Sequence, residues 1–173
     1  EAYKMTGDEA FRGPAQKAID FIADAQYIDG GWRYQPRNTT NSQQGDTSVL
    51  GWQLMALHSA NVSGLNVPET TVALAGNFLD TVQSNAGARY SYLPNHRNPS
   101  PAMTAEGLLC RMYTGWTKRN PALDDGMQFL LDNHLPRKDH ANIYYWYYGT
   151  QVAHHMGGEQ WRKWNLNMRT ILV

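Results

Sequence analysis

The chain has 173 residues, which is enough for one domain with a substantial apolar core. Its 15 basic residues balance 15 acidic ones, so no field gathers phosphates, and nucleic acid is not an expected partner. The one cysteine, Cys110, excludes an internal disulfide and a multi-thiolate metal site. We therefore expect no metal and no cofactor. The compartment stays undetermined, because one buried cysteine fits either side of a membrane. No apolar run approaches the ~18 residues of a spanning helix, which leaves only contact with a membrane surface open.

Apolar residues recur at helical spacing from the first third of the chain onward. A first helix is expected over residues 15–27, with Asp29-Gly30-Gly31 ending it, because glycine adopts positive φ at low cost. A second helix begins at Asp46, a favourable N-cap, and extends to about Ala60. It is apolar most of the way round, which is typical of a helix surrounded by neighbours.

The remaining helices are marked by residues that favour helix starts. Pro68 opens one that ends near Gln83, Ser100-Pro101 begins another, and Asn142 caps a third. No strand alternation of useful length interrupts them. The expected helices of this part cover residues 68–83, 101–116, 121–133, 143–156 and 159–173.

Two segments recur along the sequence, which predicts a repeat of helix pairs. Residues 21–26 return at 78–83 and, more loosely, at 129–134; residues 46–57 return at 103–113 and 149–156. The start resembles the tail of an inner helix, and the end resembles an outer helix before its turn. We therefore expect residues 1–173 to form a single helical-repeat domain, cut from a longer array whose other repeats pack against it.

The pattern from Ala18 to Trp32 resembles the glutamine–tryptophan repeat of squalene–hopene cyclases and the related prenyltransferase and squalene-oxidase repeats. Its marker residues, for which we expect a structural role, are Gln26, Gly30, Trp32, Gln83 and Gly87. The resemblance implies an all-α fold, an α/α toroid of alternating outer and inner helices. About three helical hairpins and a last outer helix would be present here.

Asp46 is the candidate catalytic acid that the resemblance implies, because the cyclases protonate an alkene with an aspartate at the start of an inner helix. Here one carboxylate stands where that family has three, and a lone aspartate has no partner to tune its proton. The favoured interpretation of Asp46 is an N-cap. The zinc ligands of the prenyltransferases are also missing, because Leu108 stands where their aspartate would precede Cys110.

Five consecutive aromatic residues form the other candidate site, together with Trp52. Such a run covers every face of a helix, so at least two rings must point away from the helix stack. They would either fill the hub of the toroid or line a ligand surface. The five residues are Tyr144, Tyr145, Trp146, Tyr147 and Tyr148.

Two functions follow from the resemblance and the candidate residues. The first is a cyclase- or prenyltransferase-like repeat domain that binds an isoprenoid or other apolar ligand in the toroid cavity, with catalysis unproven. The second is a non-catalytic module that binds protein or glycan on a toroid scaffold. The missing aspartates and zinc ligands favour the second, and the aromatic inner helices favour the first.

Overall fold

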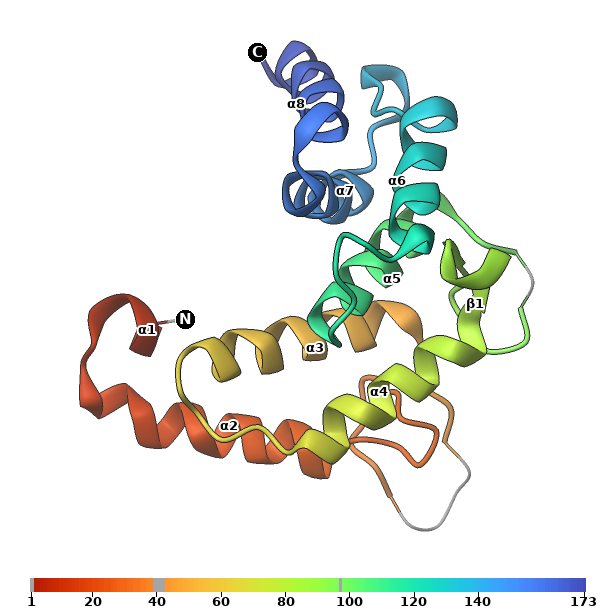
Figure 1. Ribbon diagram of the computed structural model, residues 1–173. Helices are drawn as coiled ribbons and strands as arrows, with labels where there is room; N and C mark the ends of the chain where they lie inside the picture. The colour runs from red at the N-terminus through yellow and green to blue at the C-terminus, as the bar shows by residue number, and fades with distance from the viewer. Residues whose placement is uncertain (1, 39–42, 97) are drawn as a thin grey trace. The chain divides into compact units, whose positions relative to one another are not determined.

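The structure, a computed structural model, describes residues 2–38, 43–96 and 98–173. It is mostly helical, which confirms the all-α prediction, and the described residues contain eight α-helices (Figure 1). Two antiparallel strands of two residues each, β1 (Gln83–Ser84) and β2 (Arg89–Tyr90), join α4 to α5. The helices are α1 (Ala2–Thr6), α2 (Arg12–Asp24), α3 (Thr47–Val62), α4 (Glu69–Val82), α5 (Pro101–Tyr113), α6 (Pro121–Asn133), α7 (Ile143–Met156) and α8 (Gly158–Leu172).

The helix starts follow the capping residues read from the sequence. The side chains of Asp46, Ser100, Asn120 and Asn142 each accept a backbone amide in the first turn of the following helix. Three boundaries differ from expectation, and one of them is the end of α2 at Asp24, three residues before the expected end at residue 27. Helix α2 begins at Arg12, one turn earlier, and α5 ends at Tyr113, because Gly115 at φ +109° turns the chain away.

The chain divides into two compact units, residues 1–78 and 79–173. In the first unit, α2 and α3 lie side by side and antiparallel (Figure 1). The buried face of α3 supplies Leu50, Leu54 and Leu57, and α4 adds Phe78. Helix α3 therefore contributes more buried apolar residues to this unit than α2 or α4 does.

A tight turn after α2 brings the following loop against α4 within the first unit. Gly30 lies at φ +86°, and a Cβ on it would stand 2.0 Å from the carbonyl oxygen of Leu74. The side-chain amide of Gln26 donates to the carbonyls of Gly30 and Thr71, both at 2.9 Å. The turn and α4 are thus joined by buried hydrogen bonds around a glycine that no other residue can replace without strain.

In the second unit, α5 packs against both α6 and α7. Glycines allow close approaches of β2 to α5 and of α8 to α7: the ring of Tyr90 covers Gly107 of α5, and the indole of Trp164 covers Gly149 of α7. Tyr90 and Trp164 are fully buried as a result, and Tyr148 is fully buried as well. Aromatic rings seated on glycines therefore form much of this core.

The repeats do not place equivalent residues at equivalent helix positions. Thr47 is the first residue of α3, Thr104 is the fourth of α5, and Thr150 is the eighth of α7. The sequence spacing therefore locates the helix pairs but not their internal register. No helix in the described part of the chain is long and apolar enough to cross a membrane.

Candidate functional site

A pocket of about 410 Å³ lies where α2 ends, the following loop turns and α3 begins, within the first unit. It combines exposed aromatic rings with one cation, a composition that suits a ligand with both apolar and charged parts. Its lining residues are Phe21, Ile22, Ala25, Trp32, Arg33, Tyr34, Pro36, Val49, Trp52 and Gln53.

Arg33 is the charged residue of this pocket, and Asp46 holds it. Its Nε lies 3.1 Å from Oδ2 of Asp46, a carboxylate that is fully buried, while the Arg33 side chain is 42% exposed. Within the part of the chain that the structure describes, no hydrogen bond or ion pair engages the two terminal nitrogens of Arg33. One edge of the guanidinium is therefore anchored, and its terminal fork can bind a ligand.

Asp46 also begins α3, so it links the helix to the pocket. Its Oδ1 accepts the amide of Val49 at 2.8 Å and the hydroxyl of Ser48 at 3.2 Å. Its own amide donates to the carbonyl of Trp32 at 3.1 Å. The N-cap interpretation of Asp46 is therefore correct, and the same residue orients Arg33.

The loop that carries Arg33 is fixed on both sides. The carboxylate of Asp29 accepts the amides of Gly31 and Gly45, at 2.9 and 2.8 Å. The hydroxyl of Tyr27 donates to the carbonyl of Gln35 at 2.6 Å, and burial raises the pKa of Tyr27, which keeps this donor protonated. The loop therefore presents Arg33 in a preorganised position.

Three aromatic side chains give the pocket apolar faces. Phe21 is 61% exposed, Tyr34 is 84% exposed and Trp52 is 48% exposed. The first two come from α2 and the loop, and Trp52 comes from α3. Exposed rings of this size on one pocket are typical of binding surfaces, because they gain much when a ligand covers them.

The structure places Trp52 in this pocket and the five consecutive aromatics in the second unit, on α7. Tyr145 and Tyr148 are buried, Tyr144 and Trp146 are half-buried, and Tyr147 is exposed. The Tyr144 hydroxyl donates to the fully buried carboxylate of Glu106 at 2.8 Å, and the Tyr145 hydroxyl donates to the carbonyl of His134 at 2.8 Å. These two tyrosines thus make structural hydrogen bonds within the second unit.

The repeat-motif residues have unequal environments. Gln26 makes two buried hydrogen bonds, whereas Oε1 of Gln83 is buried with no partner among the described residues. Gly30 and Gly87 both have positive φ, and a Cβ on Gly87 would stand 2.5 Å from the Trp116 ring. Trp32 is buried and donates from its indole to the carbonyl of Ile22 at 2.8 Å.

The sequence reasoning missed Arg33. The sequence does contain an indication of its role: Arg33 directly follows the Gly-Gly-Trp turn, which places a cation on a fixed loop. What the sequence did not reveal is that the capping aspartate of the next helix would pair with it. Among the described residues, no group of three His, Cys, Asp or Glu side chains could hold a metal ion.

The comparisons with known proteins correct the resemblance. A family model described as pectic acid lyase matches residues 1–46, and no curated protein and no solved structure matches the chain. The assignment to squalene–hopene cyclase and prenyltransferase repeats is therefore wrong. The two functions derived with it, an isoprenoid-binding repeat domain and a non-catalytic protein- or glycan-interaction module, are wrong for the same reason. The glycine–tryptophan turn on which the resemblance rested lies inside the matched segment.

Proposed function

We propose that the chain is part of a polysaccharide lyase that acts on pectic acid, a polymer of galacturonic acid, and that Arg33 recognises a sugar carboxylate. One observation carries this proposal: the segment that matches the pectic acid lyase model supplies seven of the ten residues that line the Arg33 pocket. These seven residues are Phe21, Ile22, Ala25, Trp32, Arg33, Tyr34 and Pro36.

The chemistry of such a lyase is a β-elimination. A base removes the proton on the carbon next to the carboxylate, the bond from the β carbon to the glycosidic oxygen breaks, and a carbon–carbon double bond forms. The leaving oxygen takes up a proton, and no water is consumed. The difficult step is the first, because the carboxylate already carries a negative charge that opposes the carbanion.

Arg33 fits the requirement of that step. A guanidinium fork pairs with a carboxylate through two parallel hydrogen bonds, and it lowers the cost of further negative charge on that group. Asp46 anchors it at Nε, so the terminal nitrogens stay available to a ligand in the pocket that Arg33 lines. The fixed loop places this charge before the substrate arrives, which is how electrostatic catalysis gains most.

The other lining residues supply the rest of a saccharide site. The rings of Phe21 and Trp52 offer faces for the apolar side of a sugar ring. The amide of Gln53 can bind hydroxyl groups, and the exposed hydroxyl of Tyr34 is the lining group that can transfer a proton. Tyr34 is therefore our candidate for proton transfer.

A second part of the proposal is that the chain forms part of the α/α toroid expected from the sequence, together with further repeats. What supports a toroid is the contrast between α2 and α8, which bury one and two residues, and α3 and α5, which bury seven and nine; α6 and α7, with six and five, do not follow this contrast. Helices buried this fully are typical of an inner layer. We propose that further repeats of the parent protein continue the array.

The test is the appearance of an unsaturated uronate, which absorbs ultraviolet light, when the chain is incubated with polygalacturonate. We expect absorbance to rise with the wild-type chain and to fall to background with Arg33→Gln. Arg37→Gln is the matched control, because Arg37 is on the same loop and does not line the pocket. Cleavage of the polygalacturonate without a rise in absorbance would indicate hydrolysis and overturn the proposal. Equal rates for wild type and Arg33→Gln would also overturn it.

A further inference from the structure

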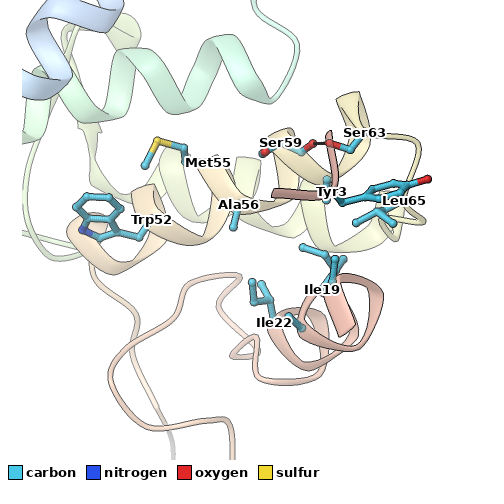
Figure 2. A pocket seen from close by; sticks show the side chains of 12 residues that line it. Tyr3, Ile19, Ile22, Trp52, Met55, Ala56, Ser59, Ser63 and Leu65 are labelled. Carbon is cyan, nitrogen blue, oxygen red and sulfur yellow. Dashed lines mark hydrogen bonds between the residues drawn. The ribbon is translucent and has the colours of Figure 1, made fainter. Parts of the chain in front are cut away.

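A second pocket, of about 350 Å³, adjoins the Arg33 pocket within the first unit (Figure 2). Ile22 and Trp52 line both pockets, so the two pockets lie next to each other along α2 and α3. We name this second pocket the α2–α3 chamber. Figure 2 shows Trp52 at one end of it and Tyr3 with Leu65 at the other.

The chamber is mostly apolar, because aliphatic and aromatic side chains make up most of its lining and two of its hydroxyl groups are engaged in hydrogen bonds. Alanines from both helices and the side chains of Ile19 and Met55 line it. The hydroxyl of Ser63 donates to the carbonyl of Ser59 at 2.6 Å, and the hydroxyl of Tyr3 donates to Glu9 at 3.1 Å. The chamber therefore favours an apolar group over water, which needs several polar partners.

The volume of the chamber limits which apolar groups can fit inside it. An apolar cavity of about 150 Å³ accommodates a benzene ring, so a chamber of 350 Å³ can hold an aryl group or a short acyl chain. A free sugar, with hydroxyls around its ring, would lose their hydrogen bonds there. The polar part of a ligand belongs at Arg33, and an apolar part belongs beyond Trp52.

We propose that the saccharide bound at Arg33 carries an apolar substituent, aryl or acyl, that occupies the α2–α3 chamber. This inference rests on the proposed function, because it takes the carboxylate at Arg33 as the anchor. The proximity of the two pockets, which have Ile22 and Trp52 in common, is what assigns the chamber to the same ligand. The site would then select substituted galacturonate over the plain sugar acid.

The test uses three probes in calorimetric titrations of the chain: galacturonic acid, an aryl galactoside without a carboxylate, and an aryl galacturonide. We expect the aryl galacturonide to bind roughly tenfold more tightly than either half, because burial of an aryl group contributes on that scale. Ala18→Leu and Ala56→Leu fill the chamber from α2 and from α3. Each should reduce the affinity for the aryl galacturonide to that for galacturonic acid.

Two controls keep the outcomes separate. Ala73→Leu adds the same side chain at an exposed position of α4 outside the chamber, and it should change nothing. Arg33→Gln should weaken both acidic probes. If neither filling variant reduces the aryl preference, or no preference exists, the inference is wrong while an effect of Arg33→Gln still supports the proposed function. If Arg33→Gln leaves both acidic probes unchanged, the proposed function is wrong and the inference falls with it.

Discussion

Nε of Arg33 lies 3.1 Å from Oδ2 of Asp46, while Oδ1 of the same carboxylate accepts the amide of Val49 at 2.8 Å. One buried side chain therefore begins α3 and orients the cation of the pocket. Because the two contacts use different oxygens, a substitution can remove one and keep the other. This separation makes Asp46 the most informative position in the first unit.

Asp46→Asn should keep the helix cap and lose the ion pair. Asparagine caps helices as well as aspartate does, so we expect the free energy of unfolding to fall less for Asp46→Asn than for Asp46→Ala. Affinity for galacturonate oligomers should fall several-fold, because Arg33 is no longer held in place. Asp46→Ala removes the cap as well and should cost roughly 1 kcal/mol more. Urea unfolding and calorimetric titration measure the two effects; a higher affinity of Asp46→Asn would show that Asp46 competes with the ligand instead of positioning Arg33.

Gly30→Ala should be among the most destabilising substitutions in the first unit. A Cβ there would stand 2.0 Å from the carbonyl oxygen of Leu74, in addition to the strain of a positive φ. Gly64 has φ +75° and no atom within 4 Å of a built Cβ, so Gly64→Ala pays the backbone strain alone. We expect about 1 kcal/mol for Gly64→Ala and more than about 4 kcal/mol for Gly30→Ala in urea unfolding. Equal costs would mean that the turn does not approach α4 so closely.

Tyr144→Phe should destabilise the second unit by roughly 1.5–3 kcal/mol, because a phenol hydroxyl that donates to a buried carboxylate is lost. The contact is the 2.8 Å hydrogen bond to Oε2 of Glu106. Tyr34→Phe removes a hydroxyl from an exposed side chain and should change stability by less than about 0.5 kcal/mol. Denaturant unfolding of both variants provides the comparison, and a Tyr144→Phe value as small as the control would contradict a structural role for this pair.

Stability should decrease as the pH falls below about 6.5, the ordinary pKa of histidine. Burial lowers the pKa of His58, and burial with the nearby charge of Arg89 lowers the pKa of His134. Between the lowered and the ordinary value, the unfolded chain binds more protons than the folded chain, so acid favours unfolding there. Urea midpoints measured from pH 7.5 to 5.5 should fall less for His58→Gln and His134→Gln than for wild type. Identical slopes would show that neither histidine contributes.

The sequence was sufficient for the helices because their signals are local. Capping residues such as Asp46 and Asn142 and the apolar periodicity depend on neighbours in the chain, and these predictions hold. The candidate site was only partly predictable. Trp52 was identified from its place on an apolar helix, but Arg33 gains its role from a contact with Asp46, thirteen positions along the chain, which periodicity does not encode.

The five consecutive aromatic residues show a second limit of prediction from the sequence. Five adjacent rings indicate that some must leave the helix interface, but not which ones. Tyr145 is buried and its hydroxyl donates to the carbonyl of His134, whereas Tyr147, two residues along the same helix, is exposed. Contact of the protein with a membrane surface stays a prediction. The family resemblance was misleading because a glycine–tryptophan turn after a helix solves a packing problem that different families share.

The most direct measurement is the titration of a short galacturonate oligomer into the wild-type chain, Arg33→Gln and Arg37→Gln, with the neutral galactose oligomer as a second ligand. We predict that Arg33→Gln weakens binding at least about tenfold, as expected for a lost charge-assisted pair, whereas Arg37→Gln stays near wild type. The neutral oligomer should bind weakly to all three. Equal affinity of wild type and Arg33→Gln, or equal binding of the neutral oligomer, would contradict recognition of a uronate carboxylate at Arg33.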